Sequence, residues 1–210
     1  MDPDKIKMAK RTKVMAVGDI HGDKSLVDRL VKKADKEEVD LVILTGDISW
    51  VENSLENMVG PFTQGGREVL LIPGNHEHFT TTKFLADLYG GAKDIHGGYF
   101  RKGDLGIFGA GNADSGPFSV SEKELDSLLK NSHEKIKDSK KKIMVTHMHP
   151  LGGGSEDSGF PGSENIRNAI DKFKPDFVFH GHVHERGGVY KKIGNTKVFN
   201  VSRKPVIFEI

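Results

Sequence analysis

Apolar residues occur along this chain in short continuous runs, and each run ends in a cluster of polar residues that often contains glycine. The runs are rich in Val, Ile, Leu and Phe and do not alternate with polar positions, which is typical of strands that are buried on both faces. They cover residues 14–17, 41–44, 69–72, 105–108, 143–145 and 177–179. The pattern therefore predicts a core of largely parallel strands.

Amphipathic patterns with helical spacing lie between these runs. Leu26 and Leu30 are four residues apart on one such segment. Ser121 and Glu124 form a capping box, a pattern that marks a helix start, ahead of another apolar stripe. Ser163 precedes a third stripe in the same manner. Alternating strands and helices predict an α/β fold.

The pattern changes near the end of the chain. After residue 187 it consists of short strand-like pieces that are interrupted by Gly194-Asn195 and Pro205. We expect a hairpin-like ending there, which would make the sheet mixed. The chain shows no internal repeat and no linker. The sequence therefore predicts a single domain over residues 13–210, preceded by a loose basic tail over residues 1–12.

Composition excludes several classes of protein. With 36% apolar and 29% charged residues and a formal net charge of +1, the 210-residue chain is unlike a disordered one. No apolar run is long enough to span a bilayer, so a membrane partner is not expected. The chain has no cysteine, which excludes disulfides, thiolate zinc sites and cysteine nucleophiles. The lysine-rich start lacks an apolar signal segment, so we expect a cytoplasmic protein.

Polar side chains with metal-ligand chemistry follow nearly every predicted strand, where ligands bind in open α/β sheets. They are Asp19, His21, Asp47, Asn75, His76, His147, His182 and His184. Oxygen and imidazole donors without sulfur suit Mn, Fe, Zn, Co or Ni. The set is too large for one tetrahedral site but suits two metals that share a bridging carboxylate. Two divalent ions with two aspartates and a hydroxide keep about one positive charge, which would attract a phosphate.

These residues form five motifs that resemble, in order, those of the calcineurin-like metallophosphoesterase superfamily. The small Icc-like branch is the most similar, and the resemblance runs from residue 18 to residue 184. The motifs are Gly18-Asp19-Ile20-His21-Gly22, Gly46-Asp47, Gly74-Asn75-His76-Glu77, Thr146-His147 and Gly181-His182-Val183-His184.

The resemblance implies a four-layer α-β-β-α sandwich of two mixed β-sheets. It also implies two divalent or mixed-valence metal ions, Mn or Fe foremost, with Zn, Co or Ni as alternatives. One ion would be bound by Asp19, His21, Asp47 and His184, and the other by Asp47, Asn75, His147 and His182. His76 would face the substrate phosphate and the leaving group without binding metal, so His76, Asn75 and Asp47 are the expected catalytic residues.

The implied activity is hydrolysis of a small phosphodiester or phosphomonoester by in-line attack of a hydroxide that bridges the metals. Gly46-Asp47 is followed by Ile48-Ser49 and not by the Asp-Arg-Gly triplet of the protein-phosphatase branch, which disfavours a protein phosphatase. A nuclease of the same superfamily is the enzymatic alternative, but the near-neutral charge does not favour nucleic acid as a partner. An interaction scaffold with a vestigial metal site is a third alternative, which the complete motifs disfavour.

Two assignments stay open on sequence alone. His149 follows His147 by two residues, so either imidazole could face a metal, and we favour His147 because it directly follows the apolar run. His149 and His180 are then expected to pack against, or hydrogen-bond beside, the metal-bound imidazoles, where such rings are oriented. The glycine-rich segment 152–162 could present amides to a phosphate, although a flexible loop is favoured.

Overall fold

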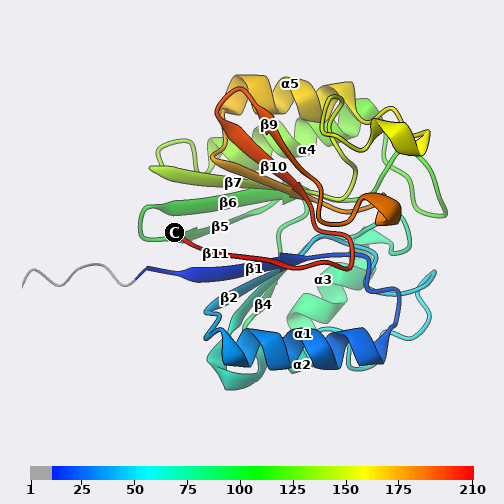
Figure 1. The fold of residues 1–210 in the computed structure, drawn as a ribbon, viewed down its shortest axis with the longest axis vertical. Coiled ribbons are helices and arrows are strands. Elements are labelled where there is room, and N and C mark those ends of the chain that lie inside the picture. The colour runs from blue at the N-terminus through cyan, green and yellow to red at the C-terminus, as the bar shows by residue number, and fades with distance from the viewer. Residues whose placement is uncertain (1–10) are drawn as a thin grey trace, which may run out of the picture.

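The computed structural model describes residues 11–210 (Figure 1). Residues 1–10 of the expected tail lie outside the described residues, and the domain boundary at residue 13 stays a prediction. Thr12 already belongs to the sheet edge, because its N–H and C=O both pair with Ile210 at 3.0 Å.

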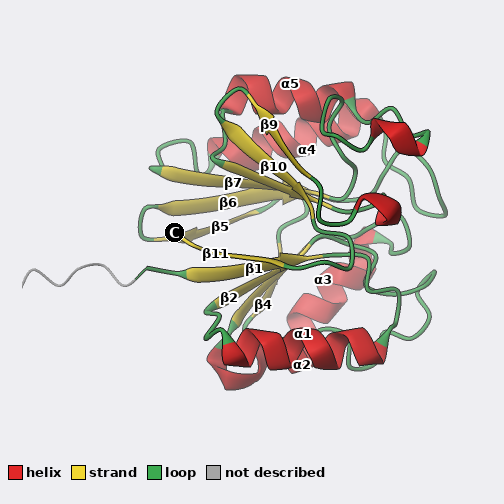
Figure 2. Ribbon diagram, in the orientation of Figure 1, coloured by secondary structure: helices red, strands yellow, loops and turns green. Residues whose placement is uncertain are grey.

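Two mixed β-sheets form the centre of the molecule (Figure 2). The first sheet has the strand order β11-β1-β2-β3-β4, and the second has β5-β6-β7-β8-β10-β9. The strands of the first sheet are β1 (Lys13–Val17), β2 (Leu41–Leu44), β3 (Glu68–Leu71), β4 (Ala92–Asp94) and β11 (Val206–Glu209). Those of the second are β5 (Tyr99–Lys102), β6 (Leu105–Ala110), β7 (Lys141–Thr146), β8 (Phe177–His180), β9 (Tyr190–Ile193) and β10 (Thr196–Asn200).

The strands are buried on both faces because each sheet packs on the other sheet and on helices. In β1, Val14 and Ala16 belong to the apolar core between the sheets, whereas Met15 and Val17 pack toward the helices. Helices α1 and α2 cover the outer face of the first sheet, and α4 and α5 cover the second (Figure 1). The expected four-layer α-β-β-α sandwich is confirmed.

The helix boundaries follow the sequence signals. Ser121 caps α4 by accepting a hydrogen bond from the Glu124 N–H, and Ser163 caps α5 through the Ile166 N–H. The α-helices are α1 (Lys24–Lys36), α2 (Gly60–Thr63), α3 (Phe79–Leu88), α4 (Glu122–Glu134) and α5 (Glu164–Phe173). Within residues 11–210, no helix combines the length and apolar character that crossing a bilayer requires.

The hairpin-like ending is only partly correct. Strands β9 and β10 are antiparallel neighbours, as expected. Strand β11 instead leaves the second sheet and pairs antiparallel with β1 in the first, with Val14 opposite Phe208. The last apolar piece therefore closes the edge of one sheet beside its first strand. The chain consequently crosses from one sheet to the other twice, once after β4 and once after β10.

Candidate metal centre

The motif residues meet where the carboxyl ends of both sheets come together. Asp19 and His21 follow β1, Asp47 follows β2 and Asn75 follows β3, so the first sheet supplies four of these residues. The second sheet supplies His147 after β7, and His182 and His184 after β8. Parallel strands bring these distant sequence positions to one edge, as expected for ligand sites in open α/β sheets.

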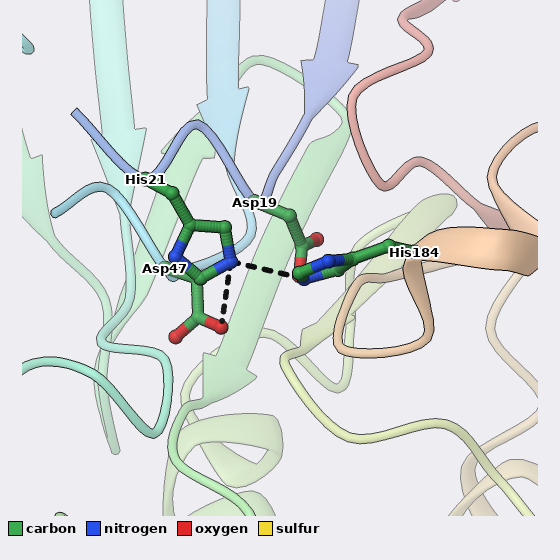
Figure 3. A group of neighbouring side chains, drawn as sticks. All are labelled: Asp19, His21, Asp47 and His184. Atoms are coloured by element: carbon green, nitrogen blue, oxygen red, sulfur yellow. Dashed lines mark hydrogen bonds and ion pairs between the residues drawn. The ribbon is translucent and has the colours of Figure 1, made fainter. Parts of the chain in front are cut away.

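Four of these side chains form one compact cluster, drawn in Figure 3. One potential ligand atom from each of Asp19, His21, Asp47 and His184 lies within 4.8 Å of the others. The His21 and His184 Nε2 atoms are 2.9 Å apart, and His184 Nε2 is 3.0 Å from Asp19 Oδ1. Asp19 Oδ2 is buried and has no hydrogen-bond partner among the described residues. Two carboxylates and two imidazoles at this separation could hold a divalent cation.

A second set of donors meets at the Asn75 side chain. Its Oδ1 atom lies 2.9 Å from His147 Nε2 and 3.0 Å from His182 Nδ1. His147 is held by its other ring nitrogen, since Nδ1 is 2.8 Å from the Thr45 carbonyl oxygen. That contact fixes the tautomer and leaves Nε2 as the electron-pair donor once the ring is neutral, an arrangement common for metal-binding imidazoles.

Asp47 joins the two sets. Its Oδ2 atom lies 3.4 Å from His21 Nε2 in the first set and 3.4 Å from His147 Nε2 in the second. Its other oxygen, Oδ1, accepts a hydrogen bond from the His76 N–H at 3.0 Å. One carboxylate thus faces both donor sets while the backbone holds it in place. This is the geometry that a ligand shared by two metals requires.

The comparison of His147 with His149 is decided by what each ring contacts. His147 faces Asp47 and Asn75, whereas His149 Nε2 lies 3.0 Å from the Phe160 carbonyl oxygen. His180 is fully buried and pairs with the Gly181 carbonyl oxygen at 3.2 Å. No hydrogen bond joins His149 or His180 to a candidate ligand ring in residues 11–210. They pack instead: the His149 ring stacks on the candidate ligand ring of His182, with centroids 6.5 Å apart, and the His180 ring lies 6.0 Å from His149.

The Calcineurin-like phosphoesterase family model matches residues 12–186, which is most of the chain. The chain belongs to this family. The family implies a dinuclear divalent metal centre, and the donor chemistry described above fits such a centre. A search of the curated proteins finds no significant match.

Several solved structures share the fold. TT1561 of Thermus thermophilus superposes with a TM-score of 0.76 at 16% identity, over 92% of this chain and 91% of that one. A dimetal phosphatase from Danio rerio gives a TM-score of 0.59 at 12% identity, over 90% and 86%. A novel archaeal phosphodiesterase gives 0.52 at 18% identity, over 90% and 82%. At these identities the likeness concerns the fold.

In this member of the family, several candidate ligands have a strained backbone. Asp19, His21, Asp47 and His182 have φ angles of 58°, 50°, 50° and 73°, in the left-handed region that L-residues with a side chain rarely adopt. The motif glycines make room for these turns. A Cβ atom on Gly74 would lie 2.0 Å from Asp47 Oδ1, so that position tolerates no side chain. Strain of this kind persists where the surrounding structure enforces it, which is common at functional sites.

The metal-free site is strongly polarised. Burial opposes ionisation of Asp47, but the His147 and His21 rings outweigh it and hold the Asp47 pKa well below its usual range. For His147, burial lowers the pKa, yet the Asp47 carboxylate outweighs burial and raises it to about 9. His182 lies further from that charge, and burial lowers its pKa to about 4. The Asp47 carboxylate and the His147 imidazole therefore each favour the charged form of the other.

His76 lies beside the first donor set without joining it. Its ring centroid is 4.8 Å from that of His21, and its Nδ1 atom is buried with no hydrogen-bond partner in the described part of the chain. The resemblance predicts this separation from the ligands. No hydrogen bond therefore ties the His76 ring to a candidate ligand side chain within the described residues.

Two residues that support the site have no role in the sequence analysis. Glu77 is buried, and its Oε1 accepts hydrogen bonds from the Ser49 N–H at 2.7 Å and the Ser49 hydroxyl at 2.8 Å. Its Oε2 accepts from the Gly74 N–H at 3.0 Å, so it ties the loop after β2 to the loop after β3. Arg203 contacts the carbonyl oxygens of Asp19 and Ile20 at 3.3 and 3.4 Å.

The glycine-rich segment 152–162 does not offer its first amides to the site. The Gly153 N–H donates to the Pro150 carbonyl oxygen, and the Gly154 N–H donates to the Glu156 carboxylate at 3.0 Å. A short 3₁₀ helix, Glu156–Ser158, follows within the same segment. These contacts order the loop internally and leave neither amide available for a phosphate.

Proposed function

We propose that this chain is a dinuclear metal-dependent phosphoesterase that hydrolyses a small phosphodiester or phosphomonoester. The observation that carries the proposal is the position of Asp47 Oδ2, 3.4 Å from an imidazole nitrogen of each donor set. The proposed ligands are those that the sequence predicts: Asp19, His21, Asp47 and His184 for one ion, and Asp47, Asn75, His147 and His182 for the other. Mn and Fe are the proposed metals.

Two divalent ions in these positions would acidify a shared water and bind the oxygens of an in-line displacement. The chain's own residues prepare the site for this chemistry. Asp47 offsets part of the ionic charge from both sides, and the His76 N–H fixes its orientation. The neutral His182 and Asn75 side chains add no negative charge, so an anionic phosphate is not repelled by them. His76 is proposed to interact with the phosphate and with the departing oxygen.

A metal-dependent hydrolysis assay tests the proposal. Protein treated with a chelator should be inactive toward bis-p-nitrophenyl phosphate and p-nitrophenyl phosphate. Activity toward at least one of them should return when Mn²⁺, Fe²⁺, Zn²⁺ or Co²⁺ is added. Elemental analysis should then find two metal ions per chain. Full metal occupancy without hydrolysis of either ester would contradict the enzymatic proposal.

Metal binding should also release a proton, because His147 must lose one to coordinate through Nε2. With its pKa raised to about 9 by Asp47, the ring is protonated in the metal-free protein at pH 7.5. We expect His147 to contribute about one proton per chain at this pH and progressively less as the pH rises past about 9. Protons lost by the shared water, and by His184, whose pKa is raised by its hydrogen bond to Asp19, add to this release. His182, whose pKa burial lowers to about 4, is already neutral and releases none.

Calorimetric titration with Mn²⁺ in buffers of different ionisation enthalpy measures this release. The apparent affinity for the ion at His147 should rise about tenfold per pH unit up to about pH 9. An enthalpy that does not depend on the buffer at pH 7.5 would show that His147 is neutral before metal binds, or that it is not a ligand.

A further inference from the structure

A large aromatic side chain lies exposed at the edge of the metal centre. Trp50 is three residues beyond Asp47 in the loop after β2, and it remains 57% exposed. Its ring centroid is 4.6 Å from that of His76 and 5.2 Å from that of His21. An indole in this position contacts the residue proposed to face the leaving group while keeping more than half of its surface available.

The turn that carries Trp50 is closed and strained. The Trp50 N–H donates to the Asn53 carbonyl oxygen at 3.3 Å, and the Asn53 N–H donates back at 3.0 Å. Val51 and Glu52 have φ angles of 48° and 60°. A left-handed conformation is especially unfavourable for a β-branched residue such as Val51. Strain at this position indicates that the surrounding contacts hold the turn in one shape.

Glu52 anchors this turn to the loop that bears His76. Its backbone N–H donates to the His76 carbonyl oxygen at 3.1 Å. Its carboxylate accepts a hydrogen bond from the His78 N–H at 3.1 Å and another from the Thr81 hydroxyl. The indole of Trp50 and the imidazole of His76 are therefore held in a fixed relation before any substrate binds, which reduces the ordering cost of binding.

We propose that Trp50 is a stacking surface for a planar ring on the leaving-group side of the substrate. The inference rests on the proposed function and narrows its substrate class to phosphoesters whose leaving group carries a flat ring, either a nucleobase or an aryl group. The other exposed apolar side chain of the turn is Val51, which is 38% exposed. Phe160 is also exposed, but its ring centroid lies 5.5 Å from that of His182, which belongs to the donor set around Asn75.

Binding can be read directly because the chain contains a single tryptophan. The metal-loaded full-length protein is titrated with adenosine 5′-monophosphate against ribose 5-phosphate, and with phenyl phosphate against butyl phosphate, and the fluorescence is read on mixing, before turnover. Fluorescence excited at the red edge of the indole band then reports on Trp50 alone. Quenching by the ring-bearing member of a pair, without quenching by its partner, is the expected result. Quenching by neither ring-bearing ligand would overturn the inference, whatever the fate of the proposed function.

Kinetics provide the second measurement. Two pairs of methyl phosphodiesters are compared. In the first pair the leaving group is a ribosyl group that either carries adenine or lacks it. In the second pair the leaving group is an ethyl group that either carries a naphthyl ring or lacks it. Each pair has a matched scissile bond. Trp50→Ala should lower the preference in kcat/KM for the ring-bearing member by roughly 5- to 150-fold, the range typical of stacking on an aromatic side chain.

Controls separate stacking from structural support of His76. Trp50→Phe should restore part of the preference, and Phe84→Ala, which removes an exposed aromatic ring of α3, should leave it unchanged. Equal losses on both members of each pair would mean that Trp50 only supports His76, and would overturn the inference. A loss confined to the adenine pair identifies a nucleobase, and a loss in both pairs identifies any flat ring. Hydrolysis of every diester without ring preference would reject stacking while the proposed function stands.

Discussion

Asp47→Asn is expected to remove both metal ions and nearly all hydrolytic activity. The asparagine amide lacks the negative charge of the Asp47 carboxylate, whose Oδ2 atom faces both donor sets. Changes to residues that merely orient metal ligands typically cost about 10–100-fold in metal affinity, so loss of a shared ligand should exceed this for each ion. Elemental analysis of the purified variant should show parallel loss of both metals, and circular dichroism should show an intact fold.

Asp94→Asn is the matched control. Asp94 ends β4 at the same edge of the first sheet, but its carboxylate accepts a hydrogen bond from the His96 N–H at 2.8 Å and lies outside the metal cluster. This variant should retain both metals. If Asp47→Asn lost only one ion, Asp47 would not be the bridging ligand.

His76→Gln is expected to slow hydrolysis without changing metal content. The imidazole contacts His21 but shares no hydrogen bond with a candidate ligand side chain within residues 11–210. If it donates a proton to the departing oxygen, its loss should lower kcat by roughly 10²–10⁴-fold, the usual contribution of a positioned general acid. The effect should be largest for alkyl esters, because a phenolate departs without needing that proton. Measuring kcat of the variant for one alkyl and one aryl phosphodiester shows whether the loss is larger for the alkyl ester.

The alternative role gives a different result. If the imidazole mainly stabilises charge on the phosphoryl oxygens, both esters should slow equally. His78→Gln, two residues away, is a suitable control because His78 caps α3 through the Thr80 N–H. Loss of metal from His76→Gln would instead show that this imidazole is a ligand.

The buried strands were predictable from sequence because they are apolar on both faces. The elements that the pattern does not predict are short, polar or exposed. Strand β4 reads Ala-Lys-Asp and lies at the edge of its sheet, and β5, Tyr-Phe-Arg-Lys, is mostly exposed. Helix α3 contains three consecutive threonines, which have low helix propensity, so its pattern is weak.

The positions of the candidate ligands were predictable because each lies in the loop that follows a strand whose end the apolar run marks. The supporting residues were not, because their partners are set by tertiary contact. Glu77 and Ser49 are 28 residues apart, and Arg203 contacts the Asp19 carbonyl across 184 residues. No local pattern marks such pairs. The placement of β11 was not predictable for the same reason, because its pairing with β1 joins the two ends of the described chain.

The division of the donors between two sheets has a consequence for the order of events during synthesis. The first sheet contributes Asp19, His21, Asp47 and Asn75, and the second contributes His147, His182 and His184. A ribosome that has made only the first half of the domain exposes three oxygen donors and one imidazole, a set that favours hard, weakly held cations. The imidazole-rich half arrives last, and β11 must then return to the first sheet. If the two donor sets bind metals as proposed, neither site is complete until the second sheet has formed, so we expect the ions to be taken up late, from those available after the chain leaves the ribosome.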